Sequence, residues 1–488
     1  MSRWLFYGRG RELLELEEIL QRQRWFFARI TGRRRIGKTT LIQQALEGSK
    51  RRVFYVQIPD SAPAGVLSAI RDAMETFSLL EEFAAPDSLR RLADTIGKMA
   101  EAGIVVVLDE FQYFARAQLG EFTSYLQAVV DDLSRRAEQV PGGLFVLGSL
   151  HTELVALLED RSAPLYNRTT DQIELVHLDI ASVLEILAAH TDGFDPGRLL
   201  FLWNIFEGVP KFYRDCYEQD VLGADRQQLL RSMFFRSSSP LKSEAENWFL
   251  SELRGRYDVV LKFVARNPGC SNGDITAHVK EVSPERSEQT GGYLKILIEK
   301  YRMVERRLPI FAKDGARSGR YYVQDNFLRA WLGALSTPVS AINFRPETKL
   351  LEQADQRLMD IEGYGLEKLV AQLYEERSRK AVGDFPLTER LYGYWERQGT
   401  ELDLIALDGD NRRVRLGTCK RNPDKLIADL PAFDGHIERF LQSKAGRFKG
   451  WTVERVAIAP ALDDMQRAAI VARGYAPQDL DDLTTGLR

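Results

Sequence analysis

Short apolar runs alternate with stretches of helical periodicity through the first half of the chain. The runs that are candidates for strands are residues 25–31, 53–57, 104–108, 144–147 and 172–176. Between them, apolar residues recur at the three- and four-residue spacing of an amphipathic helix. Strands that alternate with helices predict a parallel α/β sheet.

The pattern becomes helical after about residue 180. Residues 182–190 and 198–206 have amphipathic spacing with no strand run near them. We therefore divide this half of the chain into an ATPase-like core at residues 1–178 and a helical lid at residues 179–247.

Residues 257–330 follow another order, in which three helices precede two short extended runs. The second helix is expected at 272–279, a recognition helix at 287–300, and the extended runs at 303–308 and 320–323. A charged, Gly-containing turn separates the two runs. This order predicts a winged helix-turn-helix, which we bound at residues 248–335.

A third α/β region follows a Pro-containing connector at residues 336–346. Its expected elements are a helix at 364–377 and strands near 402–407 and 414–419, within a domain at residues 346–488. A chain of 488 residues is too long for one hydrophobic core, so several domains agree with its length.

Composition excludes several classes of protein. The net charge of -3 gives no global basic field, so nucleic-acid contacts would need a local patch. Three widely spaced cysteines without a CxxC pair predict reduced thiols, and none of the five histidines is paired at metal-ligand spacing. No apolar run is long enough to span a membrane, and the first residues are unlike a secretory signal. We expect a cytoplasmic protein with no membrane partner.

A phosphate-binding loop is the strongest motif. It fits GxxxxGK[ST], lies between a strand candidate and a helix-forming run, and comprises Gly32, Arg33, Arg34, Arg35, Ile36, Gly37, Lys38 and Thr39, with Thr40 opening the helix. The glycines permit a tight loop whose N–H groups hold phosphates. Lys38 would reach the β- and γ-phosphates of ATP, and Thr39 would be a ligand of Mg²⁺.

Two carboxylates follow the third strand candidate. Asp109 would hold Mg²⁺ through water, and Glu110 would polarise the attacking water as a general base. A solvated strand end is the alternative interpretation, which the upstream loop makes weaker. Ser149 follows the fourth strand candidate, where a small polar side chain could sense the γ-phosphate.

These motifs resemble the prokaryotic ATPase family first described in archaea, a branch of the STAND and AAA-like NTPases. The opening box of that family is matched by Phe6, Gly8, Arg9, Glu12 and Leu13, with Gly10 in place of a usual glutamate. Further matches are Asp109-Glu110-Phe111-Gln112, Pro164-Leu165-Tyr166-Asn167-Arg168 with Asn167 as a departure, Gly208-Val209-Pro210, and the segment from Tyr321 to Trp331.

The resemblance implies roles for two more residues. Arg168 would be a sensor or arginine finger, supplied in cis or by a neighbouring subunit, with a surface salt bridge as the structural alternative. Pro210 would lie near the nucleotide in the lid. The family often ends in a winged helix and a restriction-endonuclease-like module, so the resemblance covers nearly the whole chain.

The predicted winged helix has most of its positive charge in its wing. Lys295 and Lys300 are the only basic residues of the expected recognition helix. The wing carries Arg302, Arg306, Arg307, Lys313, Arg317 and Arg320. Such a cluster suits phosphate contacts with DNA. The alternative is a winged helix that packs on the ATPase as a regulatory arm.

The last region has a nuclease-like order of residues with one departure. Glu367, Asp403 and Lys420 occupy the positions of two metal-binding acids and the lysine that helps to activate water. Thr418 stands where the next carboxylate belongs, and a hydroxyl cannot supply its charge. We therefore expect a degenerate site with weak or no cleavage. Tyr392, Tyr394 and Trp395 could stack on bases but are better explained as core aromatics.

The leading hypothesis is an ATP- and Mg²⁺-dependent switch that acts on DNA. ATP would close the lid over the loop, hydrolysis through Glu110 would reopen it, and the C-terminal domains would change what they bind. A DNA-cleaving effector of a defence or mobile-element system is the first alternative. The second is a signalling scaffold that forms homo-oligomers with ATP and touches no nucleic acid.

Overall fold

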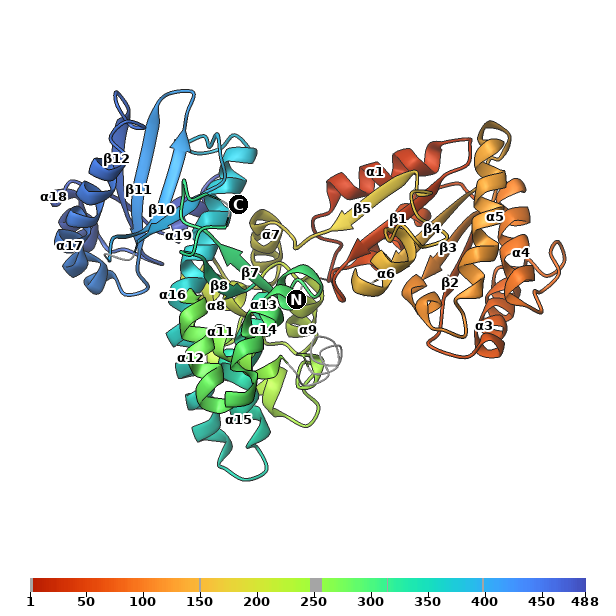
Figure 1. Cartoon of the computed structure of the whole chain (residues 1–488), viewed down its shortest axis with the longest axis horizontal. Helices are drawn as coiled ribbons and strands as arrows, with labels where there is room; N and C mark the ends of the chain where they lie inside the picture. The colour runs from red at the N-terminus through yellow and green to blue at the C-terminus, as the bar shows by residue number, and fades with distance from the viewer. Residues whose placement is uncertain (1–2, 149–150, 246–256, 314, 397–398) are drawn as a thin grey trace. The chain divides into compact units, whose positions relative to one another are not determined.

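The computed structural model describes residues 3–148, 151–245, 257–313, 315–396 and 399–488. The chain folds as two compact units, one formed by residues 8–177 and the other by residues 1–7 together with 178–488 (Figure 1). The first unit is therefore inserted near the beginning of the second. Each unit is described by itself below.

A five-stranded parallel sheet is the centre of the first unit. Its order is β2-β3-β4-β1-β5, with β1 Phe27–Gly32, β2 Val53–Gln57, β3 Val105–Asp109, β4 Gly143–Gly148 and β5 Asp171–Leu175. All five strands lie where the apolar runs predict them, and every pairing between them is parallel. The predicted α/β sheet is confirmed.

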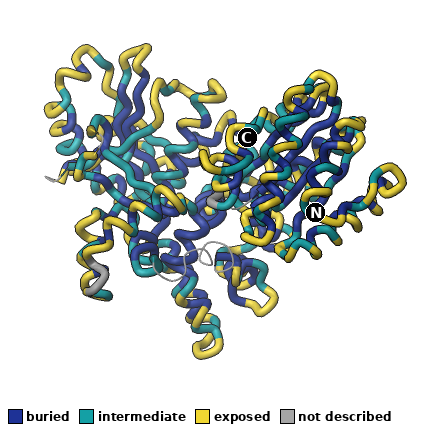
Figure 2. Tube along the Cα trace, turned by 45° about the vertical axis from the view of Figure 1, so that its right-hand side comes forward, coloured by how far each residue is buried: buried dark blue, intermediate teal, exposed yellow. Residues whose placement is uncertain are grey.

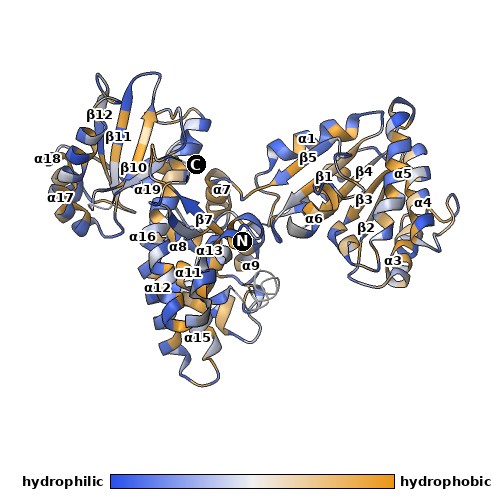
Figure 3. Cartoon of the chain, viewed as in Figure 1, coloured by the Kyte–Doolittle hydropathy of each residue, from blue (hydrophilic) through white to orange (hydrophobic). Residues whose placement is uncertain are grey.

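Helices cover this sheet and complete its core. They are α1 Gly10–Gln21, α2 Lys38–Glu47, α3 Pro63–Thr76, α4 Leu89–Glu101, α5 Glu121–Arg135 and α6 His151–Leu158, with a 3₁₀ turn at Phe111–Ala115. All residues of β3 and β4 are buried. Buried segments fill the interior of the unit in Figure 2, and both strands are strongly hydrophobic in Figure 3. Strands buried on both faces have continuous apolar runs, which made them easy to predict.

The strand order determines which residues meet at the carboxyl ends of the strands. β4 lies between β1, which leads into the glycine loop, and β3, which ends at Asp109. In a parallel sheet the carboxyl ends of all strands meet at one edge. The loop after β1 and the acids after β3 are therefore brought to the same edge.

Short helices begin the main part of the second unit. They are α7 Ile180–His190, α8 Pro196–Phe206, α9 Pro210–Glu218 and α10 Arg226–Leu230, followed by a π turn at Arg231–Phe235. The start of the chain joins them, because Trp4 stacks on His190 with ring centroids 5.3 Å apart. The Tyr7 hydroxyl also lies 2.7 Å from Nε2 of His190.

Residues 257–340 combine helices with a small antiparallel sheet. The elements are α11 Asp258–Arg266, β6 Cys270–Ser271, α12 Asn272–Val282, a 3₁₀ helix at Pro284–Gln289, α13 Thr290–Glu299, β7 Val304–Arg307, β8 Arg320–Val323, α14 Asn326–Ala330, a π turn at Trp331–Leu335 and α15 Ser336–Ser340. The sheet order is β6-β8-β7. The helices and strands follow the order expected from the sequence, with the short strand β6 in addition, and the winged helix itself stays a prediction.

One long helix connects the helical region to the last sheet. α16 spans Glu347–Arg379 and begins 17 residues before the predicted start at residue 364. Gly363 and Gly365 lower the helical propensity of this stretch. Packing explains Gly365, because a Cβ there would lie 2.3 Å from Oδ1 of Asn204 on α8. Tertiary contact thus outweighs the local preference.

A mixed sheet forms the last part of the second unit, which we call the C-terminal module. Its order is β13-β12-β11-β10-β9, with β9 Tyr392–Trp395, β10 Glu401–Asp408, β11 Arg413–Cys419, β12 Thr452–Ile458 and β13 Ala476–Gln478, and helices α17 Pro423–Ser443, α18 Asp464–Ala472 and α19 Leu480–Thr484. The β9–β10–β11 pairings are antiparallel and the β11–β12–β13 pairings are parallel.

Two further expectations concern the whole chain. Cys216, Cys270 and Cys419 are all unpaired and buried. Among the described residues, no helix is both long and apolar enough to cross a lipid bilayer.

Candidate functional site

The glycine loop turns the chain sharply from β1 into α2. Gly32 has a φ of 148°, Arg35 of 66° and Gly37 of 97°. At Gly32 a Cβ would lie 2.6 Å from the carbonyl oxygen of Leu175 at the end of β5. Conformation and space therefore both favour glycine at the first position of the motif.

Lys38 is buried and bonded to the loop that carries it. Its Nζ donates to the carbonyl oxygens of Gly32 at 2.9 Å and Arg33 at 3.0 Å. Burial lowers the pKa of this amine to about 8, although the charges of Glu110 and Asp109 oppose the shift. A buried ammonium bonded only to neutral carbonyls can gain from a phosphate anion.

Asp109 joins three elements at the edge of the sheet. Its Oδ2 accepts hydrogen bonds from the hydroxyl of Thr39 and the hydroxyl of Tyr55, both at 2.7 Å. Its Oδ1 accepts from the backbone N–H of Glu110 at 2.8 Å. The two residues that the sequence assigns to Mg²⁺, Thr39 and Asp109, are thus in direct contact.

Tyr55 is a residue of this site that sequence reasoning missed. It lies on β2, two positions before Gln57, the register partner of Asp109. Burial and the charge of Asp109 raise the pKa of its hydroxyl, so the group stays protonated and donates. Phe54 and Val56 on the same strand are buried, while Val53 and Tyr55 share the half-buried face. The sequence alone gives no signal that singles out Tyr55.

Glu110 stands at the turn where β3 ends. It adopts a left-handed conformation with φ 57° and ψ 37°, directly before the 3₁₀ turn. Its Oε2 accepts a hydrogen bond from the amide of buried Gln112. The Gln112 amide therefore orients the carboxylate. Ser149, the predicted γ-phosphate sensor, falls outside the described residues.

The donor set fits a magnesium–nucleotide group better than a bare metal. No group of three or more His, Cys, Asp or Glu able to hold an ion is found in the described part of the chain. Thr39 and Asp109 offer one hydroxyl and one carboxylate, which are oxygen ligands of the kind Mg²⁺ takes alongside water and phosphate oxygens. When bound, such an ion would neutralise developing phosphate charge.

The opening box lies beside the loop. Arg9 is 9% exposed, and its guanidinium donates to the carbonyl oxygen of Ile36 at 3.4 Å, to that of Val176, and to Glu12 at 3.0 Å. The side chain therefore ties the glycine loop to the segment that follows β5. The opening box and the glycine loop are therefore in direct contact through Arg9.

Arg168 lies at the amino ends of the strands, at the end of the sheet opposite the glycine loop. It precedes β5, and β5 runs parallel to β1 with Ala28 opposite Asp171. The five residues of β5, which separate Arg168 from the end of the sheet where the loop lies, span about 16 Å at ~3.3 Å per residue. Its guanidinium is held by Asp131 of α5 at 2.7 and 3.0 Å. Arg168 therefore lies at the other end of the strands from the loop of its own chain, and its role as a sensor or arginine finger stays a prediction.

Pro210 is the first residue of α9 in the second unit. The preceding Gly208 is tightly packed, since its Cβ would lie 2.2 Å from the carbonyl oxygen of Leu178, and the N–H of Leu178 donates to Gly208 at 2.8 Å. The Gly-x-Pro turn therefore fixes the beginning of the second unit. The predicted nearness of Pro210 to the nucleotide stays a prediction.

A second constellation forms in the C-terminal module. Oδ2 of Asp403 accepts from the Thr418 hydroxyl at 2.8 Å, the Cys419 backbone N–H at 3.0 Å and Lys420 Nζ at 3.1 Å. Glu367 on α16 is close enough for the charge of Asp403 to act on it. Burial first, and then Asp403, raises the pKa of Glu367 to about 8. Glu367, Asp403, Thr418 and Lys420 thus lie together, but Lys420 already neutralises the aspartate.

The predicted basic wing is divided by the fold. Arg307 lies over the ring of Tyr322 at 4.8 Å, Arg320 lies over Trp395 at 4.7 Å and pairs with Glu401, and Arg306 donates to Ala316. Arg302, Lys313 and Arg317 are exposed. Half of the cluster therefore packs the wing, and the other half is open to solvent.

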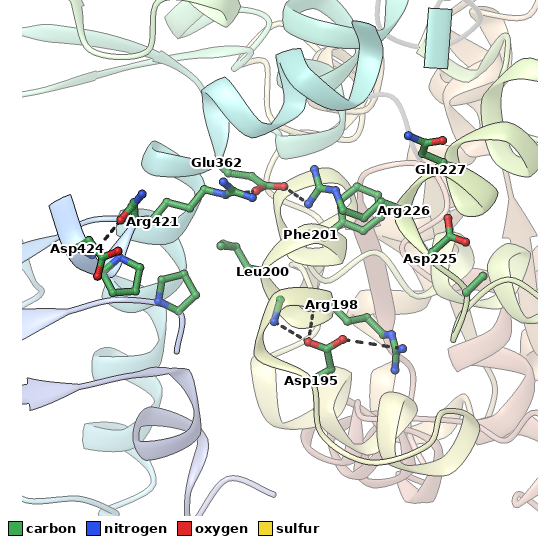
Figure 4. A pocket seen from close by; sticks show the side chains of 15 residues that line it. Asp195, Arg198, Leu200, Phe201, Asp225, Arg226, Gln227, Glu362, Arg421 and Asp424 are labelled. Carbon is green, nitrogen blue, oxygen red and sulfur yellow. Dashed lines mark hydrogen bonds and ion pairs between the residues drawn. The ribbon is translucent and has the colours of Figure 1, made fainter. Parts of the chain in front are cut away.

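A groove of about 1100 Å³ separates helices α8 and α10 from the C-terminal module. Glu362 of α16 lies between Arg226 and Arg421, and Arg421 Nε approaches its carboxylate to 2.7 Å (Figure 4). The helix ends beside the groove are capped by Asp195 and Asn422. Because both arginines pair with Glu362, they join α10 to the segment after β11 and do not form an open anion site.

Comparison with known proteins supports the description of the first unit. A family model described as an ATPase domain predominantly from Archaea matches residues 6–211. An uncharacterized protein of Methanocaldococcus jannaschii is 23% identical over 453 residues, covering 87% of this chain and 91% of that protein.

Solved structures resemble the chain at low identity. A Walker-type ATPase of Pyrococcus abyssi is 16% identical with a TM-score of 0.50, covering 67% of this chain and 96% of its own. The ORC2 protein of Aeropyrum pernix, solved in ADPNP–ADP complexes, is 15% identical with a TM-score of 0.46, covering 74% and 96%. The family match to residues 6–211, together with the parallel sheet and the glycine loop, supports a P-loop NTPase fold for the first unit.

Proposed function

We propose that this protein binds ATP with Mg²⁺ and hydrolyses it as a nucleotide-operated switch. The observation that carries the proposal is the contact between the Thr39 hydroxyl and Asp109 Oδ2, beside a lysine bonded to the carbonyls of a glycine loop. A hydroxyl and a carboxylate from separate segments then lie at the carboxyl end of the sheet with a buried ammonium, which is the arrangement that phosphoryl transfer requires.

Nucleotide binding would exchange the partners of Lys38. The phosphates would replace the carbonyls of Gly32 and Arg33 at its Nζ, and the loop N–H groups would take the other phosphate oxygens. Thr39 and Asp109 would hold the Mg²⁺ that accompanies the nucleotide, with Tyr55 keeping a bond to the aspartate. This exchange needs no movement of the sheet.

Glu110 would act as the general base. Its carboxylate accepts the proton of a water that attacks the γ-phosphorus, the bond to the bridging oxygen breaks, and ADP and phosphate leave. The amide of Gln112 orients the carboxylate. Arg168, placed at the opposite edge, would contribute only to the site of a neighbouring copy, so the arginine-finger role implies a homo-oligomer.

The second unit would deliver the effect of the nucleotide to DNA. Elements α11 to β8 have the order of a winged helix, and the C-terminal module holds Glu367, Asp403 and Lys420 together without the carboxylate at Thr418. We infer a DNA-binding part with little or no cleavage. A DNA-cleaving effector is the second candidate, favoured only by the assembly of those three side chains.

The decisive experiment measures retardation of DNA by purified protein with no nucleotide, with ADP and with a slowly hydrolysed ATP analogue. Nucleotide-dependent retardation that Lys38→Ala abolishes is the expected result. No retardation in any state, together with ATP-dependent growth in mass, would favour the scaffold instead. Plasmid nicking in Mg²⁺ that Asp403→Ala abolishes would favour the effector.

A further inference from the structure

The tip of the wing lies against the C-terminal module. Ile310 donates its backbone N–H to the carbonyl of Gly393 on β9 at 3.0 Å and belongs to the hydrophobic core of that module. Trp395 Nε1 donates to the carbonyl of Ser318 at 2.7 Å. The wing is thus a joint between two parts of the second unit.

Basic residues from both parts surround this joint. Arg447, in the turn after α17, lies over the ring of Phe311 at 4.2 Å, and Phe311 also packs on Phe448 at 6.0 Å. The same region carries the residues that we call the composite rim, which are Lys313, Arg317, Lys444, Arg447 and Lys449. All of these are exposed except Lys444, which is half-buried and lies over Tyr394 at 5.6 Å.

We propose that the composite rim, formed jointly by the tip of the wing and the turn after α17, binds the phosphate backbone of double-stranded DNA. This inference rests on the proposed DNA function and assigns it a surface. Exposed cations on two adjoining turns suit a polyanion with regularly spaced charges, whose contacts position it without reading sequence. Glu396, a nearby carboxylate, is engaged by the Tyr394 hydroxyl at 3.0 Å.

The expected recognition helix is less suited to be the main surface. α13 carries Lys295, which approaches Glu299 within 3.9 Å on the same exposed face. Its other lysine, Lys300, follows the end of the helix and lies 5.4 Å from the ring centre of Tyr301. α13 therefore offers fewer unpaired exposed cations than the composite rim.

The test compares two charge-reversal variants of the full chain. Lys313→Glu with Lys449→Glu changes the rim, and Lys295→Glu with Lys300→Glu makes the same change of charge on α13. Arg447 is left intact because its stack on Phe311 packs the joint. Binding to a fluorescent duplex of mixed sequence is measured by anisotropy at several salt concentrations, after thermal unfolding has shown that both variants fold.

The rim variant is expected to bind about tenfold more weakly or worse. The slope of its log–log salt dependence falls by about 2, one unit for each phosphate that the variant no longer neutralises. The α13 variant keeps most of the affinity. Equal reductions in affinity, or a larger reduction in the α13 variant, would overturn the assignment while leaving DNA binding intact. A native protein that binds no duplex in any nucleotide state would remove the proposed DNA function itself.

Discussion

The two candidate sites use the same three residue types in different arrangements. At the edge of the first sheet, Thr39 donates to Asp109 while Lys38 bonds to carbonyl oxygens. In the C-terminal module, Thr418 donates to Asp403 and Lys420 bonds to the same carboxylate oxygen. The first lysine has only neutral partners to give up, whereas the second already neutralises its aspartate.

This difference separates a site that can take up an anion from one that is balanced internally. The first site adjoins a glycine loop whose backbone has positive φ at Gly32 and Gly37. The second site has no such loop and lacks the carboxylate expected at position 418. The energetic consequence is that only the first site gains a strong charge-assisted contact on binding a nucleotide. The predictions below test this contrast, from the largest effect to the smallest.

Removing the predicted base should have the largest effect. Glu110→Gln is expected to lower ATP turnover by about 10²–10⁴-fold and to leave ATP binding unchanged, because an amide cannot accept the proton of water. Phosphate release and nucleotide titration measure the two quantities. Glu47→Gln, an exposed change on α2, is the matched control. Full turnover in Glu110→Gln would remove the assignment.

Removing the ammonium group of Lys38 should mainly weaken ATP binding. Lys38→Ala is expected to weaken ATP binding by roughly 10- to 100-fold, the worth of a charge-assisted hydrogen bond. Isothermal titration calorimetry measures it, and Lys98→Ala, an exposed lysine of α4, is the control. An unchanged affinity would mean that the loop binds phosphate by its backbone alone.

Restoring the missing carboxylate should make the second site resemble a metal site. Thr418→Asp places like charges beside Asp403 and removes a hydrogen-bond donor, so we expect a loss of about 1–3 kcal/mol in the free energy of unfolding without metal. Added Mg²⁺ should recover part of it. Thermal unfolding with and without Mg²⁺ checks this, with Thr418→Ala as control. Equal responses of both variants to Mg²⁺ would contradict it.

The smallest effect concerns the edge where Arg168 lies. Its pair with Asp131 is partly exposed, so either single alanine substitution should cost at most about 1 kcal/mol of stability. A finger acting in a neighbouring copy would lower turnover in Arg168→Ala but not in Asp131→Ala. Steady-state ATPase assays across protein concentration distinguish the two. Equal turnover in both variants would leave only the salt bridge.

The sequence predicted well whatever depends on short-range pattern. The strands around Val105 and Leu144 are continuous apolar runs, and the glycine loop has a fixed spacing, so both were recognised without tertiary information. Tyr55 could not be found in this way, because its bond to Asp109 depends on the order of strands. The packing of Arg307 and Arg320 likewise depends on contacts between distant segments.

The start of α16 shows the same limit for secondary structure. Its glycines argue locally against a continuous helix, and only the surface of α8 explains why Gly365 is favourable there. The distance of Arg168 from its own loop, in contrast, follows from the predicted parallel sheet, because residues before one strand and residues after its neighbour lie at opposite ends. What pattern alone omits is the identity of distant neighbours.

The length of α16 has a mechanical consequence. A helix of 33 residues is a rod of about 50 Å at ~1.5 Å per residue. Near its carboxyl end, Glu376 accepts the backbone N–H groups of Ile180 and Ala181, where α7 begins just after the chain returns from the first unit. A displacement of the segment that enters α7 would therefore displace the carboxyl end of α16, and Glu367 on the same helix would move with it.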